Sequence, residues 1–176
     1  MLAAVIAWLL SSIPAAAQST PGGSAQAGNL RILQLWSDDD DRFLREWNQP
    51  TPPTLTTTTR ATIGIPLYQF IIFGGCTPDA AGNCHLTAVT SIADPGGGVY
   101  EEPFSHTVWD QSPPDGAGLL SLSPNGIAIE FEPGDAAGVY RIRVAVTDEN
   151  AGVTAVSVIE LEVRASAVAM ASWENR

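Results

Sequence analysis

Two segments near the C-terminal end of this 176-residue chain, 140–147 and 153–163, alternate between apolar and polar or small side chains. A period of two is typical of β-strands that have one buried face and one wet face. The four residues 149–152 are enough to join the two segments as an antiparallel pair. These segments therefore constrain the fold more strongly than any other feature of the sequence.

Matching the apolar faces of the two segments fixes their register, and the charged residues then agree with it. The predicted cross-strand pairs are Val144 with Ser157, Ile142 with Ile159, and Arg141 with Glu160. A slip of one residue would turn every side chain to the wrong face and separate the opposite charges. The agreement predicts an antiparallel sheet with one buried face.

Further strand-like segments precede this pair, and clusters of Gly, Pro, Asn and Asp separate them. Residues 55–63 are β-branched and half polar, as in an edge strand, whereas 67–73 are almost unbroken apolar, as in a central strand. The other expected strands are 85–92, 99–109, 119–122 and 127–132. We therefore expect an all-β fold, an immunoglobulin-like β-sandwich of about seven or eight strands over 54–163.

The N-terminal segment has the features of a secretory signal peptide. Residues 2–13 are an apolar stretch, Pro14 breaks it, and small residues at 15–17 suit a cleavage before Gln18. We predict a signal peptide over 1–17, no membrane span in the mature chain, and a periplasmic or secreted location. The absence of a cation before the apolar stretch leaves open whether the natural start lies upstream of Met1.

Residues 18–53 are expected to form a flexible linker and a short helical arm. The linker, 18–29, is rich in Gln, Ser, Pro and Gly; residues 30–36 are either a strand or the approach to the helix. Ser37 or Asp38 would cap the helix, and the acidic residues after them favour its positive end. The apolar side chains of the arm would cover a sheet edge or dock a partner: Trp36, Phe43, Leu44 and Trp47.

Cys76 and Cys84 enclose a stretch with strong turn chemistry, so we predict a structural disulfide across a hairpin loop. The spacing of seven residues is unlike that of a redox pair. A disulfide indicates an oxidising compartment. At the other end, the Ala-rich tail 164–176 is expected to be disordered or loosely helical.

The charge balance excludes several functions. The chain has 19 acidic residues against 8 cations, all of them Arg, for a formal net charge of −11. Without Lys there is no Schiff base and no phosphate-binding lysine. Without a cationic run, nucleic acid and anionic membranes are unsuitable partners. No cofactor and no metal site is predicted.

Catalytic residues were sought among the two histidines, His85 and His106, and the carboxylates. Glu130 and Glu132 would share one strand face at about 7 Å, a separation that a glycosidase can use. With Trp109 they support an alternative hypothesis, a small periplasmic hydrolase or carbohydrate-binding module. The alternation places both glutamates on the solvated side, so we expect no enzyme.

The segment 132–148, with its Gly-Val-Tyr entry, alternating strand and terminal Asp, resembles the late strand of immunoglobulin-like, cadherin-like and PKD-type extracellular modules. The FGGC, GNC, PGGGVY, EPGD and VTDENAGVT elements resemble a group of secreted bacterial proteins to which no activity is assigned. The resemblance implies a sandwich without implying a function. Asp148, Glu149 and Asn150 fit one end of a cadherin-type calcium site, and the other acidic elements of that pattern are missing.

The combined prediction is a non-catalytic exported module for protein–protein interaction or scaffolding in the bacterial envelope. Its expected partner is another envelope protein. The test between the two hypotheses is whether Glu130, Glu132 and Trp109 converge in one pocket.

Overall fold

The computed structural model describes residues 23–50, 54–113 and 119–165. The predicted signal peptide, 1–17, and nearly all of the predicted tail lie outside these residues. Within the described ranges no helix has the length and apolar character needed to cross a membrane.

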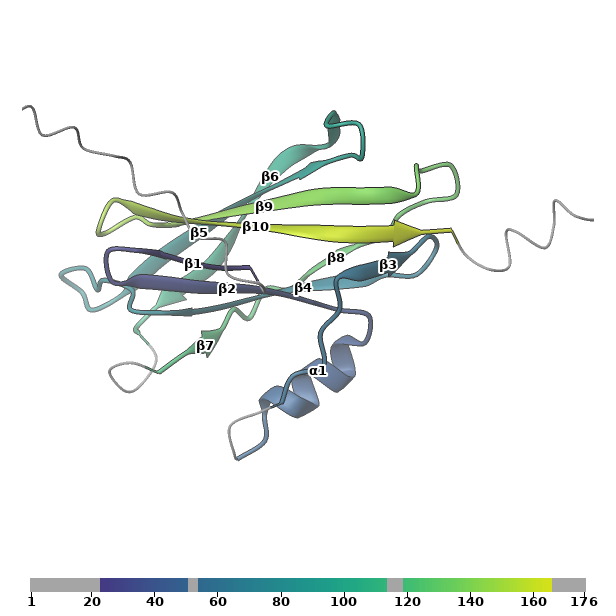
Figure 1. The fold of residues 1–176 in the computed structure, drawn as a ribbon. Helices are drawn as coiled ribbons and strands as arrows, with labels where there is room; N and C mark the ends of the chain where they lie inside the picture. The colour runs from purple at the N-terminus through teal and green to yellow at the C-terminus, as the bar shows by residue number, and fades with distance from the viewer. Residues whose placement is uncertain (1–22, 51–53, 114–118, 166–176) are drawn as a thin grey trace, which may run out of the picture.

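The described residues form ten strands and one helix, arranged as two packed sheets (Figure 1). Sheet A has the order β1-β2-β4-β7, with β8 also paired to β4, and sheet B has the order β3-β10-β9-β5-β6. The elements are β1 (Ser24–Ala27), β2 (Leu30–Ser37), α1 (Asp40–Trp47), β3 (Arg60–Thr62), β4 (Leu67–Gly74), β5 (Cys84–Ala93), β6 (Val99–Gln111), β7 (Ser121–Leu122), β8 (Ile127–Ile129), β9 (Gly138–Asp148) and β10 (Val153–Arg164).

Sheet B follows the alternating sequence closely. Strands β9 and β10 pair antiparallel, and all three predicted cross-strand pairs are confirmed: Val144 with Ser157, Ile142 with Ile159, and Arg141 with Glu160. The Arg141 and Glu160 side chains form an ion pair of 3.3 Å on the wet face. The alternation within the two strands and the short turn between them were sufficient to predict this register.

The topology is immunoglobulin-like. Strands β10, β9 and β5 lie in the order G, F, C of that fold, with β6 in the place of C′, and β4 belongs to the opposite sheet, as strand B does. Near the start of β9, the Tyr140 hydroxyl donates a hydrogen bond of 2.9 Å to the Ala136 carbonyl. This contact is the tyrosine corner of immunoglobulin-like sandwiches.

Sheet A departs from the sequence-based prediction in its first strands. The flexible-linker prediction is wrong for 24–29, because Ser24–Ala27 forms β1 and pairs with β2. Of the two alternatives for residues 30–36, the strand is confirmed: β2 lies in the interior of sheet A, between β1 and β4, so the helical arm is limited to α1. Ala25 and Ala27 pack against the core, which compensates for the weak strand propensity of β1.

Three other predicted strands are shorter than expected. Residues 119 and 120 lie outside β7. Residues 54–59 lie outside any strand, since Thr56 is held by the Glu46 carboxylate through its backbone N–H (2.6 Å) and its hydroxyl (2.8 Å). Strand β8 ends at Ile129, so Glu130 and Glu132 lie in the loop that follows and share no strand face.

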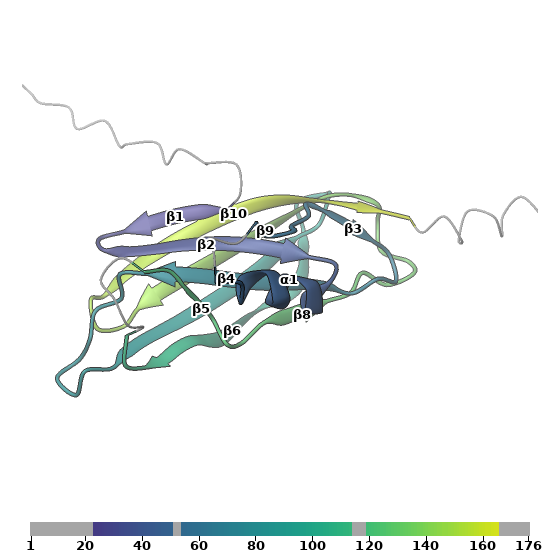
Figure 2. The same cartoon turned by 90° about the horizontal axis from the view of Figure 1, so that it is seen from below.

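Helix α1 lies on the face of sheet A that is turned away from sheet B (Figures 1 and 2). Its N-cap is Asp39, one residue beyond the predicted caps, and its carboxylate accepts the Arg42 N–H at 2.8 Å. Phe43 is fully buried and stacks on Phe70 of β4 with ring centroids 3.8 Å apart. Sheet A therefore has an apolar outer face as well as an apolar inner one.

The space between the sheets holds two apolar clusters. One includes Phe73, Leu86 and Val146, and the other includes Trp36, Tyr140 and Leu161. Inward-facing polar side chains lie along the same strands, and we call them the polar layer: Gln34, Gln69, Thr90, His106 and Ser157.

Cys76 and Cys84 form the predicted disulfide, with Cα atoms 6.0 Å apart. The hairpin prediction is wrong, because β4 belongs to sheet A and β5 to sheet B. The disulfide therefore closes an arch that connects the two sheets. Gly75 begins this arch with φ of +77°, and a Cβ there would lie 2.1 Å from the Asn29 carbonyl oxygen, so only glycine fits.

Candidate functional site

One candidate site is a groove between α1 and sheet A, with a volume of about 520 Å³. One stripe of α1 forms its first wall, with Asp40, Leu44, Trp47 and Asn48 at the spacing of a single helix face. Phe43, which lies between these residues in sequence, turns to the sheet and fixes the helix in place.

Strand β4 forms the floor of the groove through Tyr68 and Phe70, and β7, β8 and their connection form the second wall. The residues of the second wall are Leu122, Ser123, Pro124, Gly126 and Ala128. The Ser123 N–H donates to the Ile71 carbonyl at 2.8 Å, which holds this wall against β4. A volume within the usual range of ligand sites and an aromatic floor are typical of a binding groove.

Apolar residues near the two walls remain accessible. Leu44 is 39% exposed, and Leu119 and Leu120, which precede β7, are 59% and 51% exposed. Leu120 packs over Gly74 at the end of β4.

The predicted docking residues divide into two pairs. Leu44 and Trp47 line the groove, as a docking surface requires. Trp36 is 2% exposed, and Phe43 is fully buried, so neither can contact a partner in this fold. Trp36 belongs to the inner core, and Phe43 anchors the helix.

Sequence reasoning missed the floor and second wall of the groove. A usable signal was present in residues 67–73, where apolar side chains fill both faces of the strand instead of one. A strand without alternation is covered on both sides, and one of the covers of β4 is α1.

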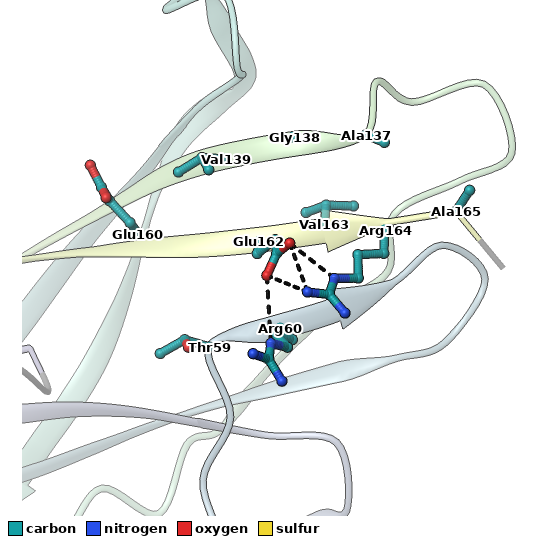
Figure 3. Close-up of a pocket in the computed structure, with 10 residues that line it drawn as sticks. All are labelled: Thr59, Arg60, Ala137, Gly138, Val139, Glu160, Glu162, Val163, Arg164 and Ala165. Atoms are coloured by element: carbon teal, nitrogen blue, oxygen red, sulfur yellow. Dashed lines mark hydrogen bonds and ion pairs between the residues drawn. The ribbon is translucent and has the colours of Figure 1, made fainter.

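A larger, more open hollow of about 750 Å³ lies at the end of sheet B, lined by residues of β3, β9 and β10. Figure 3 shows Arg60 and Arg164 reaching Glu162, at 3.5 and 2.9 Å. Both guanidinium groups contact the same carboxylate, and the second acidic residue of the hollow, Glu160, pairs with Arg141 at 3.3 Å.

His85 lies beside the arch, between two carboxylates. Its Nε2 is 3.1 Å from Asp79, and its Nδ1 is in contact with Asp110. These hydrogen bonds, that with Asp79 first, raise the pKa of the imidazole, because both favour the protonated ring. Both ring nitrogens are occupied, so this histidine holds the arch and is not free to act as a catalytic base.

His106 faces inward from β6, opposite Ala88. Burial lowers the pKa of its imidazole, and neither ring nitrogen has a hydrogen-bond partner among the described residues. With no nucleophile in contact, its chemistry is that of a neutral core side chain.

Glu130, Glu132 and Trp109 do not converge. Ile129, next to Glu130, pairs with Leu67 at the start of β4, whereas Trp109 packs against Phe73 at the other end. Six residues of strand separate these two positions, about 20 Å. The pocket that the hydrolase alternative requires from these residues is not formed.

Asp148 is buried, and its oxygens accept backbone N–H groups of Thr77 (2.8 Å), Asn150 (3.1 Å) and Ala151 (3.1 Å). Both oxygens of this carboxylate are therefore already engaged by backbone donors. Among the described residues, no group of three or more His, Cys, Asp or Glu side chains is arranged to hold a metal ion.

No protein-family model matches this chain, and no curated protein matches it. A crystal structure of an immunoglobulin-like protein from Pseudomonas aeruginosa aligns with 85% of this chain and 100% of its own length, at 15% identity and a TM-score of 0.34. The immunoglobulin-like arrangement rests on the strand order and the tyrosine corner described above.

Proposed function

We propose that this chain is a non-catalytic immunoglobulin-like module that binds a partner protein through the groove between α1 and sheet A. The observation that carries the proposal is the placement of Leu44 and Trp47 over the aromatic floor of β4, with the Leu44 side chain 39% exposed. Partly exposed aromatic and aliphatic side chains around a concave surface are typical of interface anchors.

The proposed location is the periplasm or the outside of the cell, where the partner would be another envelope protein. The Cys76–Cys84 disulfide supports an oxidising compartment. The apolar segment 2–13 and the small residues before Gln18 support export. N-terminal sequencing of the purified protein is expected to begin at Gln18, and a start at Met1 would contradict export.

Site-specific photo-crosslinking in the cells that make this protein tests the docking surface. A photoreactive residue replaces Leu44 in one variant and Val158, on the outer face of sheet B and 50% exposed, in the control. We expect a discrete crosslinked protein from position 44 and none from position 158. No product at position 44, or the same products from both positions, would contradict the proposal.

Point variants are needed for this test because residues 30–47 cannot be deleted cleanly. A deletion would remove β2 from the interior of sheet A, and with it the buried side chains of Leu30 and Trp36. Loss of binding would then report unfolding.

A further inference from the structure

The length of the groove limits what can occupy it. Its helical wall runs from Asp40 to Asn48, eight residues of rise, or about 12 Å. An extended chain covers that distance in three or four residues. Resting on the proposed function above, the occupant is therefore a short segment of the partner and not a broad folded surface.

Apolar residues of both walls and of the floor line the groove: Leu44 and Trp47 of α1, Leu122 of β7, and Phe70 of β4. Asn48, Tyr68 and Ser123 add polar groups to the lining. An occupant needs an apolar anchor to exclude water from this floor.

The charge at the groove is negative. Asp40 is the one charged residue among those that line it, and Asp38, Asp39 and Asp41 surround it in sequence. Arg42 is paired with Glu46 at 2.8 Å, and therefore does not neutralise the aspartates.

The remaining cation of the helix, Arg45, lies four residues after Asp41, the spacing of an ion pair along one face, so it offsets Asp41 and not Asp40. Arg45 lies five residues after Asp40, on a different side of α1 from the groove stripe. The chain as a whole carries a net charge of −11, which adds a repulsion against acidic partners.

We propose that the groove binds a short extended protein segment in which a large apolar side chain lies next to Lys or Arg. The apolar side chain enters between Leu44, Trp47 and Phe70, and the cation is directed to Asp40 at the N-terminal end of α1. Charge sets the choice of segment, and the apolar anchor supplies most of the affinity.

Peptide display tests this proposal without knowledge of the partner. A random heptapeptide library is selected on the purified protein at 50 mM NaCl and counter-selected on the Leu44→Ser variant. We expect enriched peptides with a net positive charge and at least one aromatic or large aliphatic residue. Enrichment of acidic or uncharged peptides, or no enrichment over the variant, would overturn the proposal.

The affinity of a synthetic peptide from the selection then separates the contribution of charge from that of the apolar anchor. We expect its affinity to fall about tenfold or more with Leu44→Ser and several-fold with Asp40→Asn, and to weaken at 500 mM NaCl. The control is Glu102→Gln, an exposed carboxylate on β6, which should leave the affinity unchanged. Equal loss with the Asp40 and Glu102 variants would overturn the assigned role of Asp40.

The photo-crosslinking experiment distinguishes the two levels of failure. If crosslinks at position 44 persist while no basic peptide is selected, the docking surface stands and the partner chemistry is wrong. If both fail, the proposed function fails with it.

Discussion

Sheets A and B each have five strands, but they use their outer faces in opposite ways. Sheet B is built mainly from long strands of 10 to 13 residues, and its outer face carries Thr, Arg and Glu side chains together with the exposed Val89, Val156 and Val158. No strand of sheet A exceeds 8 residues, and α1 and the groove lie over its outer face. The less regular sheet therefore carries the candidate site.

The difference is visible in the strand sequences. The outer face of β10 carries Thr154, Glu160, Glu162 and Arg164 beside Val156 and Val158, all of them accessible to solvent. In β4 the outward positions hold Tyr68, Phe70 and Ile72, because that face is covered by α1 and approached by the groove. Loss of alternation in a strand thus indicates a second contact surface.

The largest expected effect tests whether the outer face of sheet A is a second core. Phe43→Ala removes a fully buried ring stacked on Phe70, and should lower the free energy of unfolding by about 3–5 kcal/mol. Val158→Ala, on the outer face of sheet B, should change it by less than about 0.5 kcal/mol. Urea denaturation of both variants measures the contrast, and similar values would remove the distinction between the two faces.

Removing the Cys76–Cys84 disulfide, which closes the arch between the two sheets, should have the next largest effect on stability. Replacing Cys76 and Cys84 together by Ala frees a loop with a sequence separation of 8, and should lower the free energy of unfolding by about 2.5 kcal/mol. Thermal and urea unfolding of the oxidised protein and the variant measure this loss. A loss below about 1 kcal/mol would show that the arch stays ordered without its disulfide.

The next prediction concerns the polar layer between the sheets, and whether its buried amides destabilise the fold. Both amide atoms of the buried Gln69 have no partner among the described residues, so Gln69→Leu should raise the free energy of unfolding by about 1–3 kcal/mol. Gln34→Leu should gain less, since it removes the acceptor of the Ser157 hydroxyl at 3.0 Å. If the Gln69 variant is less stable than the parent, ordered water satisfies this amide.

The smallest expected effects concern how the free energy of unfolding depends on pH. His106 on the inner face of sheet B and His85 on its outer face should act in opposite directions. The lowered pKa of His106 makes folding less favourable as pH falls through the ordinary value of 6.5. The raised pKa of His85 stabilises the fold below 6.5, and this contribution is lost as pH rises through the folded value. His106→Phe should reduce the loss of stability from pH 7 to 5, and His85→Gln should increase it. Parallel pH profiles of the two variants would contradict the assignment.

Much of sheet B could be predicted from the sequence because its information is local. The apolar and charged faces of β9 and β10 agree on a single register, and a short turn connects the strands. The disulfide was predicted from turn residues in the same way. The loop between β4 and β5 was predicted as a hairpin because no local pattern in residues 67–92 indicates which sheet each strand joins.

The prediction for sheet A was less complete because its elements depend on distant contacts. Strand β1 has few apolar residues and forms where it meets β2 and the core. Residues 54–59 have a strand-like composition, but the Glu46 carboxylate holds Thr56 instead. Of the predicted docking residues, Leu44 and Trp47 line the groove, whereas the burial of Trp36 and Phe43 could only follow from the tertiary fold.

Gly23, at the first described position, lies at the seam between the two sheets. A Cβ there would meet Ile159 at 2.7 Å, and the Gly23 carbonyl accepts hydrogen bonds from Ser157 (2.6 Å) and the Gln34 N–H (3.0 Å). A pulling force applied to the chain at Gly23 would therefore act on both of these hydrogen bonds. One belongs to β2 and the other to β10, so the force would be shared between the two sheets.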